Sequence, residues 1–188
     1  MMKRDACLKA LAARVEHTDI VVPVFQAAFE WIVIHPSDLN YLTTGAMGQA
    51  SSHALGLALA FPDRRVIVLD GDGSLVMNLG TLITIAEQRP ANLFHFVCNN
   101  GVYEANGSHP VPGAERVDYC GLARAAGIER TSRFDELDDF DARIADVLAG
   151  GGPAFIEIAV EQGEHYEQDY TQLHSAERRA RFKQAVNP

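Results

Sequence analysis

Two polar, glycine-containing clusters follow two apolar runs in the middle of the chain. Residues 71–74 (GDGS) come directly after the run 66–69, and residues 99–101 (NNG) come directly after the run 93–98. Glycines let backbone N–H groups approach an anion closely, which suits a phosphate. A free anion would be repelled by Asp72, which lies between the two glycines. The combination therefore predicts a divalent cation that bridges this carboxylate to phosphate oxygens.

The pattern around these clusters predicts a strand–helix–strand unit that positions them. The two runs are typical of strands buried on both faces of a parallel sheet, and the helical pattern between them ends at Pro90. Its expected inward stripe is Leu75, Leu79, Leu82, Ile83 and Ala86. Asp72 and Asn100 are 28 positions apart. Such a crossover returns to the neighbouring strand, so we expect the two side chains to converge at one sheet edge. Their oxygens suit magnesium or calcium rather than zinc.

Strand and helix patterns alternate along the rest of the chain. We expect further strands at 20–22, 39–43, 128–131 and 154–160, and further helices at 3–15, 25–34, 50–60, 118–126, 134–148 and 175–183. This order predicts an α/β fold of three layers, an open and mostly parallel sheet with helices on both faces, in one domain over residues 1–188. The small-residue helix 50–60 either presses tightly on its own sheet or forms a tight subunit contact.

The composition restricts the classes of partner. The formal net charge of −9 argues against a nucleic-acid surface, and no apolar run is long enough for a membrane span. The N-terminus has no apolar core of a signal peptide. Cys7, Cys98 and Cys120 form an odd set without CxxC spacing, which favours free thiols in a reducing compartment. We therefore expect a cytoplasmic protein. The acidic stretch 135–141 is interpreted as a solvated helix start rather than a metal cluster.

The motifs together resemble the diphosphate-binding domain of thiamine-diphosphate enzymes. GDGS, the following helix and the Asn pair carry the resemblance, and TTGAMG at 43–48 extends it upstream. The alternative is an ordinary nucleotide-binding turn, although a dinucleotide fingerprint would need glycine where Val76 stands. The resemblance implies the thiamine-diphosphate-binding fold with thiamine diphosphate and Mg²⁺ as cofactors. The implied metal ligands are Asp72, Asn100 and the main-chain carbonyl of Val102.

The resemblance also implies the remaining cofactor contacts. The full set of expected cofactor-binding residues is Gly45, Met47, Gly71, Asp72, Gly73, Ser74, Asn100, Val102 and Tyr103. In this set, Met47 wedges between the two cofactor rings and Gly45 offers a carbonyl to the exocyclic amine. A lone methionine is otherwise usually core filling. His109, in the loop after Tyr103, either belongs to the active site or is simply solvated.

The likeness is strongest to the beta subunit of sulfopyruvate decarboxylases and the matching half of phosphonopyruvate decarboxylases. It implies a subunit of a 2-oxo acid decarboxylase acting on a small 2-oxo acid. The activating glutamate would belong to an alpha-type pyrimidine-binding subunit, with homodimerisation inside a larger assembly. A carboligase, a 2-oxo acid oxidoreductase subunit and a non-catalytic cofactor-binding module are the alternatives.

Three features depart from that group. Residues 104–109 read EANGSH where the group has a sequence like GSTGxQ, and residues 23–26 read PVFQ where a small or polar residue is usual. No cluster of lysine and arginine stands near the expected site in the sequence. Substrate identity is therefore the least determined part of the expected function.

Overall fold

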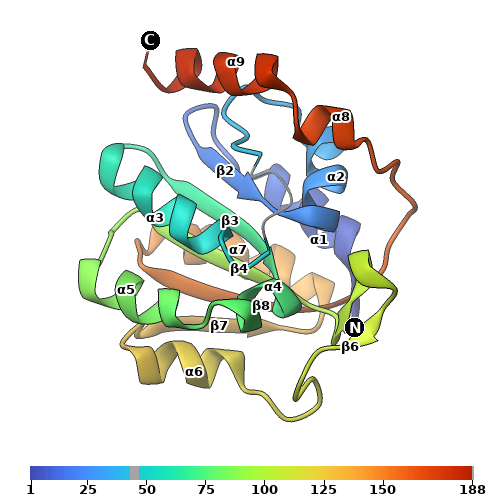
Figure 1. Cartoon of the computed structure of the whole chain (residues 1–188). Coiled ribbons are helices and arrows are strands. Elements are labelled where there is room, and N and C mark those ends of the chain that lie inside the picture. Colours follow the sequence, from blue (N-terminus) through green and yellow to red (C-terminus); the bar gives the residue numbers. More distant parts are fainter. Residues whose placement is uncertain (43–46, 188) are drawn as a thin grey trace.

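A parallel sheet forms the centre of the computed structural model, which describes residues 1–42 and 47–187 (Figure 1). Within these residues, the strands are β1 (Met2–Lys3), β2 (Ile20–Pro23), β3 (Val66–Gly71), β4 (Leu93–Asn99), β7 (Arg130–Phe134) and β8 (Ala154–Glu161). They pair in the order β2-β3-β4-β8, and both β7 and β1 pair with the other edge of β8. All of these pairs are parallel. A small antiparallel hairpin, β5 (Val102–Tyr103) with β6 (His109–Pro110), stands apart from the sheet.

Helices cover both faces of the sheet. The helices of the described part are α1 (Arg4–Ala12), α2 (Phe25–Ile34), α3 (Ala50–Ala60), α4 (Asp72–Met77), α5 (Gly80–Gln88), α6 (Tyr119–Ala126), α7 (Leu137–Ala149), α8 (Tyr170–Leu173) and α9 (Ala176–Val186), with a 3₁₀ turn η1 (Glu104–Asn106). Figure 1 shows α3, α5 and α6 on one side of the sheet and α1, α2 and α7 on the other.

The strand residues alternate between the two apolar layers. Val66 and Val68 pack with the α3, α5 and α6 side, whereas Ile67 and Leu69 pack with the α1, α2 and α7 side. Successive side chains of a strand point to opposite faces, so a strand covered on both sides needs an unbroken apolar run. The predicted three-layer α/β fold with a mostly parallel sheet is confirmed.

Some local predictions were wrong. The single helix expected after the GDGS cluster is two helices, because the chain breaks at Asn78, whose side-chain amide donates to the Gly48 carbonyl at 2.8 Å. The break resets the helical phase, so Ile83, expected inward, is 64% exposed. The strand expected from residue 39 is, in its described part, one isolated bridge between Asn40 and Val21. The strand expected at 128–131 lies at Arg130–Phe134.

Two further observations concern the cysteine thiols and the length of the helices. Cys7, Cys98 and Cys120 are buried and free. Among the described residues, no helix is both long and apolar enough to cross a membrane.

Candidate functional site

The two polar clusters meet at the carboxyl edge of the sheet. β3 and β4 are neighbours, with Gly71 opposite Cys98, so Asp72 and Asn100 leave adjacent strands at nearly the same level. The Gly101 N–H donates to Asp72 Oδ2 at 2.8 Å, which ties the second cluster directly to the first. The structure therefore places Asp72 and Asn100 beside one pocket, as the crossover length predicts.

Asp72 is a buried carboxylate whose surroundings suit a cation. It is 2% exposed, and the Gly73 N–H donates to its Oδ1 at 2.9 Å. Burial raises the pKa of Asp72, and the backbone N–H groups of Gly73 and Gly101 offset only part of that rise. Within the described residues, no lysine, arginine or histidine pairs with this carboxylate. A buried carboxylate without a counter-charge is costly, and a bound cation would remove that cost.

Asn100 adds an oriented amide oxygen. Its Oδ1 accepts from the Val102 N–H at 3.0 Å, and its Nδ2 donates to Glu104 Oε2 at 3.0 Å. One carboxylate and one carboxamide are hard oxygen donors, which fit magnesium. No group of three or more histidine, cysteine or acidic residues that could hold a metal occurs in the part of the chain that the structure describes. Asp72, Asn100 and one main-chain carbonyl would leave the octahedral shell of magnesium incomplete, and the resemblance implies that oxygens of the bound diphosphate help to complete it.

The turn between β3 and α4 forms one wall of the pocket. The position of a Cβ on Gly71 has no atom within 4 Å, so the backbone there is open to a ligand. At Gly73 the equivalent position is already filled by the ring of Tyr103. Ser74 Oγ accepts a hydrogen bond from the Gly48 N–H at 2.9 Å and still has its own proton to donate.

The remaining predicted site residues divide into three groups. Met47, Val102 and Tyr103 line the pocket together with Asp72 and Asn100. Gly45 lies outside the described residues. His109 is exposed on the β5–β6 hairpin and is not among the side chains that line the pocket.

The pocket also contains side chains that sequence reasoning missed. These are Arg4, Asp70 and Glu104, and Phe25 and Asn106 line the pocket as well. Arg4 donates to Glu104 Oε2 at 2.6 Å across 100 positions of sequence, so no local pattern could indicate it. Phe25 has a left-handed backbone conformation, φ 49°, which is rare for a large side chain.

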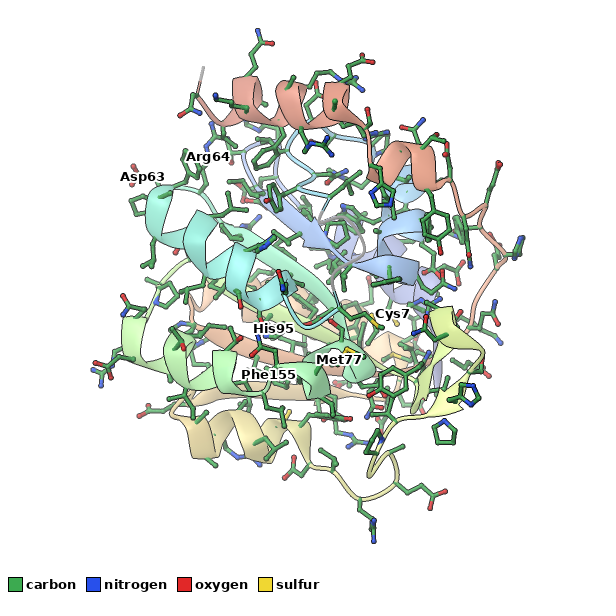
Figure 2. All side chains as sticks on the ribbon, viewed as in Figure 1. Cys7, Asp63, Arg64, Met77, His95 and Phe155 are labelled. Atoms are coloured by element: carbon green, nitrogen blue, oxygen red, sulfur yellow. The ribbon has the colours of Figure 1, made fainter. Side chains whose placement is uncertain are left out.

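Asp70 is supported from the interior of the sheet. Its Oδ1 accepts from the Gly71 N–H at 2.9 Å, and its Oδ2 lies 3.1 Å from His95 Nε2. Figure 2 labels His95 and Phe155, whose rings meet edge to face at 5.4 Å in the same layer. His95 thus fixes the Asp70 carboxylate near the end of β3, where Asp70 is one of the residues that line the pocket.

The match to known sequences decides the family. Residues 22–158 match the family described as thiamine pyrophosphate enzyme, C-terminal TPP binding domain. The chain belongs to this family. The matched segment includes both polar clusters, with Asp72 and Asn100.

Relatives of two kinds resemble the domain over most of its length. Phosphonopyruvate decarboxylase of Streptomyces viridochromogenes is 35% identical over 161 residues, which are 85% of this chain and 40% of that protein. Sulfopyruvate decarboxylase subunit beta of Methanothermobacter thermautotrophicus is 34% identical over 163 residues, 87% of this chain and 84% of the subunit. The chain thus spans less than half of the first relative but nearly all of the second.

More distant matches agree on the fold. Acetolactate synthase isozyme 1 large subunit of Escherichia coli is 29% identical over 135 residues, 64% of this chain and 23% of that protein. A solved structure described as a thiamin diphosphate-dependent enzyme from Mycobacterium smegmatis superposes with a TM-score of 0.69 at 20% identity, over 87% of this chain and 32% of that one. The superposition supports the TPP-binding fold.

Proposed function

We propose that this chain is the diphosphate- and metal-binding subunit of a thiamine-diphosphate-dependent 2-oxo acid decarboxylase. The observation that carries the proposal is that Asp72 and Asn100 follow neighbouring strands and line one pocket, beside the open backbone of Gly71. The relatives named as phosphonopyruvate and sulfopyruvate decarboxylases support the reaction class. A small 2-oxo acid is the proposed substrate.

The chain's residues would bind and orient the cofactor rather than transfer protons. Asp72, Asn100 and the Val102 carbonyl would hold Mg²⁺, and the backbone of Gly71 and the hydroxyl of Ser74 would face the diphosphate. Met47 and Tyr103 would pack against the cofactor, and Gly45 would contact its aminopyrimidine. When bound, thiamine diphosphate supplies the electron sink for loss of carbon dioxide from a 2-oxo acid.

A second subunit is part of the proposal. The relative that this chain nearly spans is named a beta subunit, which supports an alpha-type pyrimidine-binding partner that brings the activating glutamate. Glu104, in the pocket, already binds Arg4, so it is not the glutamate proposed for that task. We further propose homodimerisation within the larger assembly and a cytoplasmic location.

A carboligase is the second candidate. The match to an acetolactate synthase large subunit supports it, since this match shares the same cofactor-binding segment. The two candidates differ in product: a decarboxylase releases an aldehyde, whereas a carboligase joins two 2-oxo acids with loss of one carbon dioxide. Product analysis with one and with two 2-oxo acids separates them.

Calorimetry of Mg²⁺ and thiamine diphosphate binding tests the site. The chain, co-purified with its alpha-type partner, should lose metal-dependent cofactor binding in Asp72→Ala. Asp63→Ala is the matched control, because Asp63 is exposed in the turn before β3, at the other end of the strand (Figure 2). Unchanged affinity in Asp72→Ala would refute the metal assignment.

Turnover assays test the subunit assignment. Three-carbon 2-oxo acids with sulfonate, phosphonate or uncharged tails should be decarboxylated by the mixture of the two subunits and not by either alone. Efficient turnover by this polypeptide without a partner would refute the proposed division of the active site.

A further inference from the structure

A buried chain of hydrogen bonds connects the candidate metal ligand Asn100 to the first helix. Asn100 Nδ2 donates to Glu104 Oε2 at 3.0 Å, and the same oxygen accepts from Arg4 Nη1 at 2.6 Å. On its other side, Arg4 donates to Glu30 from Nη2 at 2.6 Å and from Nε at 3.0 Å. The Arg4 residue is only 4% exposed, and Glu30 is buried as well. Three segments far apart in sequence, α1, α2 and η1, thereby meet at the pocket.

The two hydrogen bonds of the Asn100 carboxamide determine which way it faces. The Val102 N–H must meet an oxygen, and the Glu104 carboxylate must meet a donor. A half-turn of the amide would place Oδ1 against the Glu104 carboxylate and the NH₂ group against the Val102 N–H, and both contacts would be repulsive. The amide oxygen, which is the atom a hard cation takes, is therefore held in one orientation.

Glu104 is itself held by the planar guanidinium of Arg4, which binds Glu104 on one side and Glu30 on the other. The Arg4 guanidinium reaches both Glu104 oxygens, at 2.6 and 3.2 Å, and both Glu30 oxygens as well. Burial lowers the pKa of Arg4, but the hydrogen bonds it donates to Glu104 and Glu30 outweigh that effect, so the pKa lies above its ordinary value. Arginine therefore stays charged here, and its fork geometry is what a single ammonium cannot reproduce.

Stability alone does not account for this cluster. Arg4 carries one positive charge against the two carboxylates of Glu30 and Glu104, and buried ion pairs are often no more stable than apolar replacements. Glu104 lines the same pocket as Asp72, which is buried and pairs with no lysine, arginine or histidine among the described residues. A divalent cation would balance both.

We propose that Glu104 and Arg4 are positioning residues for the metal centre. Glu104 holds the Asn100 carboxamide with its oxygen presented to the cation, and Arg4, anchored by Glu30, holds Glu104. Both residues line the pocket, and in this role they act on the cation through Asn100 rather than as its ligands. The inference rests on the proposed function, because it assigns a task to residues around the proposed metal ligand.

Replacing Glu104 separates positioning from charge. Mn²⁺ binding to the complex with its partner, in the presence of thiamine diphosphate, is measured by electron paramagnetic resonance. Glu104→Ala should weaken Mn²⁺ affinity about 10- to 100-fold, as loss of an outer-shell hydrogen bond typically does. Glu104→Gln should lose clearly less than Glu104→Ala, because its amide oxygen can accept both bonds that Oε2 accepts now, and it gives up only the longer 3.2 Å bond from Arg4 to Oε1. Equal losses in the two variants would overturn the proposal, since charge and not orientation would then matter.

A charge-conserving substitution of Arg4 and a control substitution on the surface complete the set of variants. Arg4→Lys keeps the positive charge but cannot bind two carboxylates as a fork, so it should also weaken Mn²⁺ binding, and it carries the test if Glu104→Ala does not fold. Glu161→Ala removes a carboxylate that pairs with the neighbouring residue Lys3 at 3.1 Å on the surface, and it should change nothing. Wild-type affinity in Arg4→Lys would overturn the proposal.

A second readout needs no metal or cofactor. In the metal-free chain, the side-chain NH₂ resonance of Asn100, assigned by its loss in Asn100→Ala, should exchange slowly with water because it donates to Glu104. Exchange should accelerate in Glu104→Ala and much less in Glu104→Gln. Unchanged exchange in Glu104→Ala would overturn the proposal.

The outcomes distinguish this inference from the proposed function. If Asp72→Ala and Asn100→Ala leave Mn²⁺ binding intact, the proposed metal site fails, whereas the resonance of Asn100 still reports on Glu104. If those two variants lose the metal while Glu104→Ala binds like wild type, the metal site stands and the positioning role fails.

Discussion

Substitution of Gly73 by alanine is the most direct test of how the pocket wall is packed. A Cβ at this position would lie 2.5 Å from both Cδ1 and Cε1 of Tyr103 and 3.3 Å from a Val111 methyl group. Carbon atoms in contact normally lie about 3.5–4.0 Å apart, so the overlap with the ring is about 1 Å. Overpacking of this kind costs about 1–3 kcal/mol, while alanine recovers up to about 1 kcal/mol of helix propensity. We expect Gly73→Ala to destabilise the chain by up to about 2 kcal/mol on these two opposing effects.

A double-mutant cycle isolates the contact. In the background of Tyr103→Ala the ring is gone, so Gly73→Ala should be neutral or stabilising, and the coupling energy should be about 1–3 kcal/mol. Free energies of unfolding come from urea titrations followed by circular dichroism. Gly56→Ala is the matched control, because Gly56 lies within α3 and its Cβ position has no atom within 4 Å. It should stabilise the chain by about 1 kcal/mol.

The cycle has a clear refuting result. If Gly73→Ala stabilises the chain as much as Gly56→Ala does, or if its effect is the same with and without the Tyr103 ring, then the ring does not pack on the GDGS turn. Tyr103 and the GDGS turn would then not form one wall of the pocket. A coupling energy within the expected range would also locate the β5–β6 hairpin over the start of α4.

Two further predictions concern stability. Burial raises the pKa of Asp72, so in the metal-free chain the contribution of this carboxyl group to stability is present below its unfolded pKa of about 4 and is lost as pH rises through its folded pKa. In urea titrations over that pH window, the unfolding free energy of wild type should therefore fall relative to that of Asp72→Ala. A difference between the two proteins that stays constant with pH would contradict this. Asn92 Nδ2 donates to the carbonyls of Ala58, Phe61 and Arg64 at 3.1, 3.1 and 2.7 Å. Asn92→Ala should therefore lower the unfolding free energy by about 1–3 kcal/mol and Asn92→Asp by more, because a carboxylate would face three carbonyl oxygens; the reverse order in thermal or urea unfolding would rule out this role.

Local sequence patterns were enough for most of the elements. The helices expected at 25–34 and 50–60 have these bounds in the structure. An unbroken apolar run predicts a strand covered on both faces, and a glycine-rich polar cluster at its end predicts a turn, since both depend on residues within a few positions. The spacing of Asp72 and Asn100 predicts their meeting because a parallel crossover leaves few alternatives.

Contacts between distant segments decided what the local patterns missed. The helix break at Asn78 depends on a bond to Gly48, 30 positions earlier, so the helical stripe read from sequence placed Ile83 on the wrong face. His109, for which the sequence left both an active-site and a solvated position open, is exposed on the β5–β6 hairpin and does not line this pocket.

The chemistry of the site is divided in the same way. Asp72 and Asn100 can be named from the sequence because their residue types and spacing are read along one strand–helix–strand unit. Arg4, Glu30 and Glu104 cannot, since they come from α1, α2 and η1 and have no common period or motif. Only the packing of those three segments brings their charged side chains into contact. Arg4 lies between the two carboxylates and donates hydrogen bonds to both, so the buried charges stabilise one another through it.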